Sequence, residues 1–187
     1  EVPKAPVATV QVWYKVGSRN EVMGRAGLSH MLEHMMFKGT ARYPKGSFSR
    51  IVRKNGGIDN AFTGQDFTAY FENMAADRVG LALELEADRM QGLLLDHSEF
   101  QTERDVVKEE RRLRSEDDPQ GALVEALFAQ AFLSHPYHWP VIGWFADLDA
   151  MSLEDLQRHY DTFYSPNNAT LVVVGDIKSD ALLPTIK

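Results

Sequence analysis

A chain of 187 residues with 44% hydrophobic content can bury the core of one substantial domain or of two small ones. Its net charge of −7 argues against nucleic acid as a partner and suits either basic peptides or a merely solubilising surface. The chain has no cysteine, which excludes disulfides and thiolate metal sites. No apolar run approaches the roughly 20 residues that span a bilayer, and no signal peptide is visible. We expect a soluble protein, and the bacterial periplasm and the cytoplasm both stay open.

In chain order, the sequence first predicts a strand and then a helix. Apolar and polar side chains alternate over residues 7–16, as in a half-buried sheet strand. Further on, apolar residues recur with helical spacing at Leu28, Met31, Leu32, Met35 and Met36. Lys38 suits the negative end of this helix, and Gly39 is placed to end it in a left-handed cap.

This predicted helix carries His30, Glu33 and His34. Residues three and four apart share one helical face, so the three side chains converge about one turn apart. A bare pair of histidines at this spacing is equally well explained as two surface or core residues. The order His-x-x-Glu-His, however, is the inverted zinc-peptidase motif, in which the imidazoles bind zinc and the carboxylate accepts a proton from the activated water. The motif therefore predicts a catalytic zinc site. Such a site needs a third protein ligand, which must come from another part of the chain.

The next elements predict a short helix and a hairpin. Residues 47–54 have a helical pattern, and Asn55-Gly56-Gly57 follows as a stop signal. Residues 58–63 and 67–74 flank Gly64-Gln65 and predict two paired strands. An exposed edge there would accept a peptide as an added strand, although the residues alone favour an ordinary hairpin.

The third ligand is sought in a charged helix at residues 98–118, which follows a long amphipathic helix at 77–95. We expect this charged helix to open with a Ser98-x-x-Gln101 capping box. An α-helix turns by 100° per residue, which places one stripe of residues on the same face: Glu103, Val106, Val107, Glu110 and Leu113 or Arg114. A carboxylate on a buried face costs several kcal/mol unless it is paired or binds metal. Glu110 or Glu103 is the candidate ligand, and the alternative is that each pairs with an arginine.

The C-terminal part predicts an apolar helix at 122–133, an aromatic loop at 134–149, a capped helix at 152–163 and a buried strand at 169–175. The loop carries His135 and His138, but a proline-rich loop offers no fixed ligand geometry, so we favour pocket walls or domain packing over a second metal site. We expect His97 and His159 to be structural or surface residues. Helices and strands mix without strict alternation, which predicts an α+β fold in two layers, a mostly antiparallel sheet with helices on one face.

Longer stretches of the sequence resemble one family of peptidases. The matching blocks are residues 27–40, 60–70 and 103–110, together with His135-Pro136-Tyr137 and residues 164–168. They are similar to the pitrilysin/insulysin-type inverted-motif zinc metallopeptidases, which include mitochondrial processing peptidase and many bacterial homologues. The resemblance covers essentially the whole chain and is far more specific than the five-residue motif.

The resemblance implies roles for individual residues. One zinc ion per chain is implied, with these ligands: His30, His34 and Glu110. Glu33 is implied as the general base, and Glu103 as a carboxylate that supports the site from behind a ligand. Asn60, Ala61 and Phe62 match positions where an extended substrate strand lies against the sheet edge.

The resemblance also implies what this chain is part of. Residues 1–187 look like the N-terminal metal-bearing peptidase domain, cut short at both ends and without a second domain. In the family a second homologous domain or subunit encloses the substrate and assists the reaction. We therefore expect a zinc endopeptidase domain that is weakly active or inactive alone. The alternative is a homologous partner subunit that binds peptide or metal without hydrolysis.

Overall fold

Four strands form one antiparallel sheet at the centre of the computed structural model, which describes residues 1–186. The strands are β1 (Val7–Tyr14), β2 (Ile58–Thr63), β3 (Thr68–Ala75) and β4 (Ala169–Gly175). Their order in the sheet is β2-β3-β1-β4, and each neighbouring pair is antiparallel. β2 and β4 are therefore the edge strands, and the predicted hairpin is confirmed as β2 and β3.

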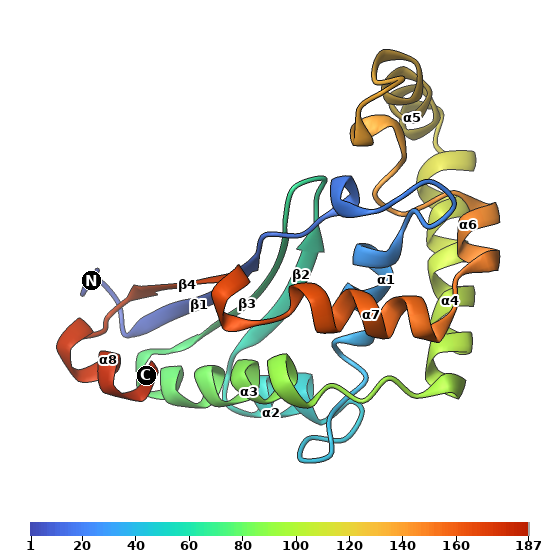
Figure 1. The fold of residues 1–187 in the computed structure, drawn as a ribbon. Coiled ribbons are helices and arrows are strands. Elements are labelled where there is room, and N and C mark those ends of the chain that lie inside the picture. Colours follow the sequence, from blue (N-terminus) through green and yellow to red (C-terminus); the bar gives the residue numbers. More distant parts are fainter. Residues whose placement is uncertain (187) are drawn as a thin grey trace.

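Helices cover one side of this sheet. The α-helices are α1 (Leu28–Met35), α2 (Ser47–Lys54), α3 (Val79–Gly92), α4 (His97–Arg111), α5 (Pro119–Ala131), α6 (Phe145–Ala150), α7 (Leu153–Phe163) and α8 (Ser179–Ile186). Figure 1 shows α2, α3 and α7 on one side, while the other side carries no helix of residues 1–186. The predicted α+β class, with helices on one face, is confirmed. None of the described helices is long and apolar enough to cross a membrane.

The core lies between the sheet and its helices. Val10, Val12 and Tyr14 of β1 alternate inward and are almost fully buried. Val12 and Tyr14 pack, directly or through neighbours, with apolar side chains of α1 and α7, among them Met31 and Leu156. Val10 belongs to a second cluster, which includes residues of α3. The apolar face of α1 is thereby fixed in the core, and its other face is free to carry the histidines.

A buried ionic group attaches α3 to the sheet. Arg89 of α3 pairs with Glu86 on the same helix and lies 3.4 Å from Glu72 of β3. Its guanidinium also lies over the rings of Phe48 and Tyr70, at 4.3 and 4.4 Å from their centroids. A buried charge needs such partners, so removing one of them should destabilise the fold strongly.

Some expected details are wrong. α1 ends at Met35, before Gly39, which has a φ of +109° in the turn beyond the helix. The N-cap of α4 is Asp96 rather than Ser98, because the Asp96 carboxylate accepts the backbone N–H groups of Ser98 and Glu99. β4 is a half-buried edge strand, not a buried one, because it has a neighbour in the described sheet on one side only.

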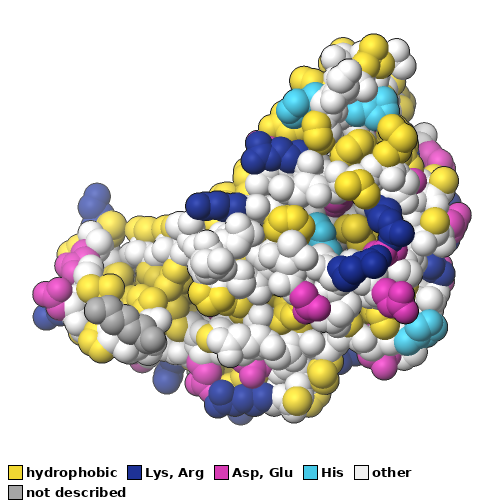
Figure 2. Space-filling model, in the orientation of Figure 1, with side chains coloured by type: hydrophobic (Ala, Val, Ile, Leu, Met, Phe, Trp, Pro, Cys, Tyr) yellow, Lys and Arg dark blue, Asp and Glu magenta, His cyan; other side chains and the backbone are white. Residues whose placement is uncertain are grey.

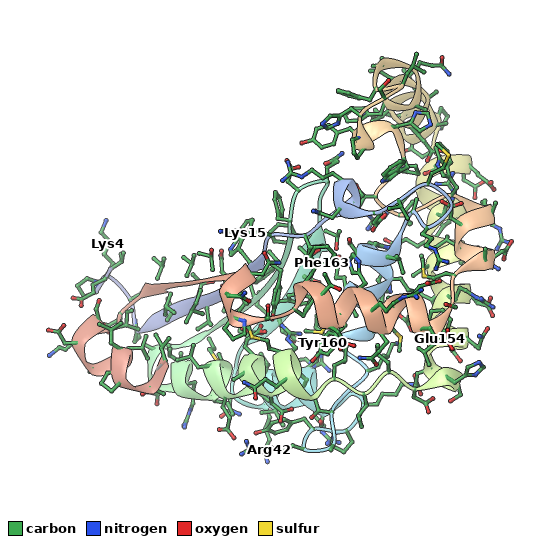
Figure 3. The ribbon with its side chains drawn as sticks, in the orientation of Figure 1. Lys4, Lys15, Arg42, Glu154, Tyr160 and Phe163 are labelled. Carbon is green, nitrogen blue, oxygen red and sulfur yellow. The ribbon has the colours of Figure 1, made fainter. Side chains whose placement is uncertain are left out.

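The uncovered side of the sheet borders a hollow. α5 projects beyond the sheet at the upper right of Figure 1, and Figure 2 shows a concave outline between this projection and the sheet. In Figure 3, Lys4 and Lys15 lie on the uncovered side, whereas Arg42 lies on the side of the helices. Because no described helix covers it, the uncovered side of the sheet is open for contacts.

Candidate metal centre

Helix α1 is fixed at its N-terminus by a buried carboxylate. Glu21 accepts the backbone N–H groups of Gly27 and Ser29, each at 2.7 Å. These N–H groups belong to the first turn, which has no partner within the helix. Burial raises the pKa of Glu21 to about 8, and the two backbone hydrogen bonds act in the opposite direction. Sequence reasoning did not single out Glu21, because its partners are defined only once the loop before α1 is folded.

His30, His34 and Glu110 come together where α1 packs against α4. One ligand atom from each lies within 4.8 Å of the others. Oε2 of Glu110 is 3.3 Å from Nε2 of His34 and 3.7 Å from Nε2 of His30. We call these three residues the His-His-Glu cluster. Helix α4 thus brings Glu110, one of the two candidate carboxylates, to the two histidines.

The donor set of this cluster fits zinc. Ligand atoms at roughly 2.0–2.1 Å from a tetrahedral ion lie about 3.3 Å apart, close to the two separations between Glu110 and the histidines. Two imidazoles and one carboxylate are also the donors of a known type of catalytic zinc site that leaves one position open. Among residues 1–186 no other group of three such side chains is close enough to hold a metal ion.

Glu103 lies behind His34 rather than in the cluster. Its Oε1 is 2.9 Å from Nδ1 of His34, and its Oε2 pairs with Lys38. A histidine that binds metal through one ring nitrogen commonly donates the other N–H to a carboxylate, which fixes the ring. The two carboxylates that the sequence offers as candidate ligands thus occupy different positions, Glu110 toward both Nε2 atoms and Glu103 toward one Nδ1.

The stripe predicted on α4 is only partly right. Glu103 is 7% exposed and Val107 is fully buried, but Val106 and Leu113 are 47% and 62% exposed. The buried face runs through Phe100, Glu103, Val107 and Arg111, and Glu110 lies at its border. The alternative of an arginine partner also holds for Glu110, whose Oε1 is 2.8 Å from Arg114. Glu110 therefore offers one oxygen to the histidines and the other to Arg114.

The charges of the cluster respond to burial and to neighbouring groups. Burial lowers the pKa of His30 to about 4, so its ring is neutral at pH 7. Burial would also lower the pKa of His34, but hydrogen bonds to Glu103 and Glu110 outweigh it and raise the value to about 9. The hydrogen bond with His34 lowers the pKa of Glu110. Burial would raise the pKa of Glu103, but hydrogen bonds with His34 and Lys38 outweigh it and lower the value. Both carboxylates beside His34 are thus held in the ionised form that binds cations.

Glu33 lies beside the cluster on α1. Thr63, the last residue of β2, donates its hydroxyl to Oε2 of Glu33 at 2.5 Å. Burial raises the pKa of Glu33, and the hydrogen bond from Thr63 opposes this shift. A carboxyl group whose pKa is raised toward neutrality can both take and return a proton. Thr63 was missed as a site residue, although it lies within the matching block at residues 60–70.

One cavity of about 840 Å³ joins these groups. It is lined by Glu33, by the His-His-Glu cluster and by Asn60, Ala61 and Phe62 of the edge strand β2. Trp139 of the aromatic loop also lines it, whereas His135 and His138 do not. His159 is buried against Ser29, with Nε2 3.1 Å from the hydroxyl, and His97 is exposed at the start of α4. The cavity thus joins the predicted edge residues to the cluster.

Comparison with known families agrees with this geometry. Residues 1–143 match the model of the insulinase family of peptidases, Peptidase family M16. The chain belongs to this family. Residues 150–187 match a second model, the Peptidase M16 inactive domain. β4 lies in this second stretch and pairs with β1, so both matched stretches contribute to one sheet.

Curated relatives carry names that agree with the family. Zinc protease PqqE of Helicobacter pylori is 43% identical over 184 residues, which are 98% of this chain and 41% of that protein. An uncharacterized zinc protease of Mycobacterium tuberculosis is 33% identical over the whole chain and 42% of that protein. A probable beta subunit of the mitochondrial-processing peptidase of Arabidopsis thaliana is 30% identical over 98% of the chain and 34% of that protein. The chain thus spans less than half the length of these relatives, and their names indicate a zinc metalloprotease.

Two solved structures have the same fold. A protease from Helicobacter pylori superposes with a TM-score of 0.96 and 43% identity, over 99% of this chain and 45% of that one. The first half of the periplasmic protease PqqL from Escherichia coli gives a TM-score of 0.85 and 25% identity, over 98% of this chain and 40% of that one. The second structure is itself described as the first half of a protease, and the present chain covers less than half of it.

Proposed function

We propose that this chain is the metal-bearing domain of a zinc endopeptidase that hydrolyses peptide bonds in extended peptides. The observation that carries the proposal is the single cavity shared by Glu33, the His-His-Glu cluster and the edge strand β2. His30, His34 and Glu110 would hold one zinc ion, and Glu103 would keep the His34 ring in place. When bound at such a site, zinc supplies a Lewis acid that makes water nucleophilic near neutral pH.

Glu33 carries the proton transfers in this proposal. It takes the proton of the attacking water and returns it to the nitrogen of the leaving amine. The hydrogen bond from Thr63 fixes Oε2 of Glu33, and because the carboxylate is rigid it also fixes the position of the other oxygen. A peptide paired with β2 would present its backbone beside Glu33 in a fixed position, which removes much of the entropic cost of reaction.

We further propose that residues 1–187 form one half of a two-part enzyme. The support is that the chain covers 45% of the similar protease from Helicobacter pylori, which leaves room in that chain for a second part of similar length. A second homologous half would enclose the cavity and add groups that stabilise the charge of the transition state. The rival proposal is that the chain is a homologous partner subunit that binds peptide or metal without hydrolysing peptides. The presence of His30, Glu33 and His34 argues against it.

The replacement Glu33→Gln tests the role of Glu33. The amide keeps the shape but cannot accept a proton, so zinc content should be retained and peptide hydrolysis should fall by about 10²- to 10⁴-fold. Glu109→Gln is the matched control, because Glu109 is an exposed carboxylate on α4 that pairs with Arg112. Hydrolysis should be measured on the most active form of the enzyme, with a second half present. Unchanged turnover in Glu33→Gln would exclude Glu33 as the base.

A further inference from the structure

One wall of the cavity has little packing of its own. We call residues 119–139 the strap; they comprise α5 and the first part of the aromatic loop. None of the 13 residues of α5 is buried, and Leu123 and Leu127 are 69% and 59% exposed. Figure 1 shows α5 projecting beyond the sheet. A helix without a buried face gains little from packing, so the contacts at its two ends determine where it lies.

The first end of the strap is fixed to α4, next to the His-His-Glu cluster. Both carboxylate oxygens of Glu125 accept hydrogen bonds from the buried Arg111, at 2.8 and 2.9 Å. The backbone of α5 also lies close to the turn that ends α4, since a Cβ atom on Gly121 would be 1.9 Å from the carbonyl oxygen of Arg114. This end of the strap is therefore fixed relative to Glu110, which lies one residue before Arg111.

The second end of the strap is held by two hydrogen bonds to segments that are distant in the chain. Tyr137 donates its hydroxyl to Oδ2 of Asp66, in the turn between β2 and β3, at 2.7 Å. Trp139 donates its indole N–H to the carbonyl oxygen of Ser18 at 2.6 Å. The ring of Tyr137 also packs against Phe132, with 5.5 Å between the centroids, so the bond to Asp66 acts on the C-terminal end of α5.

The turn between β2 and β3 is itself fixed without the strap. The loop at residues 17–20 donates two backbone N–H groups to the carbonyl oxygens of this turn, at 2.9 and 3.2 Å. Arg19 of the same loop pairs with Oδ1 of Asp66 at 3.1 Å. Thr63, which holds Glu33, directly precedes the turn. If the strap moved away, the turn and the contact with Glu33 would therefore stay in place.

The strap and the β2–β3 hairpin both line the cavity of the candidate metal centre. The strap contributes Val124, Phe128 and Trp139, and the hairpin contributes residues 60–63 and Gln65. The position of the strap relative to the hairpin therefore sets the width of the cavity. The hydrogen bonds of the second end hold the strap in that position.

We propose that the hydrogen bonds of Tyr137 and Trp139 form a latch that fixes the strap relative to the β2–β3 turn and so sets the width of the cavity for an extended peptide. Tyr137 and Asp66 are positioning residues in this account, because neither lines the cavity. A wall that is already in place spares the peptide the cost of ordering it on binding. The role in peptide binding rests on the proposed function, whereas the latch itself is a property of the fold.

A distance measurement on the chain tests the latch without any activity. The chain has no cysteine, so spin labels can be attached at Leu127→Cys on α5 and Ile58→Cys on β2, which replace side chains that are 59% and 61% exposed. Double electron–electron resonance should give one narrow distance distribution in this parent. Tyr137→Phe, which keeps the ring but removes the hydroxyl, should add a longer-distance population, and Trp139→Phe in the same chain should enlarge it.

Two controls separate the latch from general effects on the fold. Tyr43→Phe is the matched control, because Tyr43 donates its hydroxyl to Glu84 of α3 at 2.8 Å, and it should keep the narrow distribution. Asp66→Ala should act like Tyr137→Phe, and combining the two should add little, because both remove the same hydrogen bond. Circular dichroism melting shows that the variants compared are folded.

Kinetics test the part of the inference that concerns the peptide. With a second half present, Tyr137→Phe should raise KM for a fluorogenic peptide about five- to tenfold, as expected for losing one hydrogen bond to a charged group. The value of kcat should stay unchanged, because the turn that holds Thr63 and Glu33 remains fixed. Tyr43→Phe should leave both constants unchanged.

The possible outcomes distinguish this inference from the proposed function. A broad distribution in the parent, a narrow one in the double variant with Tyr137→Phe and Trp139→Phe, or the same change in Tyr43→Phe would overturn the latch. An unchanged KM in Tyr137→Phe would overturn its role in peptide binding. Hydrolysis that depends on Glu33 would in each case leave the proposed function standing. Conversely, the expected distances would support the latch even if Glu33→Gln left turnover unchanged and the proposed mechanism failed.

Discussion

At the scale of single residues, Glu103 and Glu110 each have partners on both carboxylate oxygens. Glu110 faces the two histidines with one oxygen and Arg114 with the other, while Glu103 lies between His34 and Lys38. Each positive partner keeps its carboxylate ionised, and together they hold the side chains in one arrangement. A metal-binding site needs this preorganisation, because loosely held ligands lose affinity.

His159 gives a prediction at this scale that does not depend on metal. Burial lowers its pKa from 6.5 to about 4, so the folded chain keeps the ring neutral while the unfolded chain binds a proton below pH 6.5. Stability should therefore fall as the pH drops through this range, by about 2 kcal/mol from pH 7 to pH 5. The check is the free energy of unfolding in urea at both pH values.

The contribution of His159 is isolated by comparing two variants. His159→Gln cannot titrate, so it should lose about 2 kcal/mol less than the parent between pH 7 and pH 5. His97→Gln removes an exposed histidine at the start of α4 and should follow the parent. An identical pH-dependent loss in His159→Gln and in the parent would show that His159 is not held neutral by the fold.

Site residues could be predicted from the sequence when their partners lie close to them in the chain. His30, Glu33 and His34 lie within two turns of one helix, so their spacing alone brings them together. Glu110 also needed a stripe on another helix, and the exposure of Val106 and Leu113 shows that this stripe was only partly correct. The contact between Thr63 and Glu33 joins a strand to a helix, and no periodicity within either segment can predict it.

At the scale of elements, two glycines determine where α1 begins. Gly27, with a φ of +97°, is the N-cap of α1, and Gly143, with a φ of +86°, packs against it. A Cβ atom on Gly143 would lie 2.4 Å from the carbonyl oxygen of Ala26. The aromatic loop therefore reaches the start of the metal-bearing helix only because no side chain separates the two backbones.

Gly143→Ala should therefore destabilise the chain more than a comparable glycine replacement elsewhere. A left-handed alanine and an overpacked contact together should cost roughly 3 kcal/mol. Gly56→Ala is the matched control, because Gly56 has a φ of +75° but open space around its Cα, and it should cost only about 1 to 2 kcal/mol. Urea unfolding of the two variants measures the difference. Equal losses would mean that the contact between the loop and α1 contributes nothing.

Elements with strong local patterns were predicted well, and those defined by their neighbours were not. β1, β2, α2 and α7 have alternation, turn residues or a capping box in their own sequence. β4 was predicted as a strand, but its half-buried state follows from its place at the sheet edge. The short helix α6 was predicted as loop, because six residues carry too little periodicity.

At the scale of the whole molecule, the proposed catalytic groups lie in an open hollow. The cavity is bounded by α1, β2 and α5, and Figure 2 shows the concave outline beside the projecting α5. An open cavity admits water, which weakens the electrostatic interactions that stabilise a transition state. A second half that covers the hollow would strengthen them.

The chain alone should therefore hydrolyse peptides slowly and respond to a second half. Adding a second homologous half, in the same chain or as a separate subunit, should raise kcat/KM by about 10²-fold or more, as expected for supplying one missing transition-state donor. A fluorogenic peptide assay at equal zinc occupancy makes the comparison, with Glu33→Gln in both forms as the blank. Fast, saturable hydrolysis by the chain alone would contradict the requirement for a second half.

Zinc stoichiometry tests the central claim most directly. Elemental analysis of the purified chain after dialysis against limiting free zinc should find about one zinc per chain. His30→Ala, His34→Ala and Glu110→Gln should lose it, Glu103→Gln should bind about 10- to 100-fold more weakly, and Glu109→Gln should match the parent. A parent without zinc under replete conditions, or a full equivalent retained by all three ligand variants, would contradict the account.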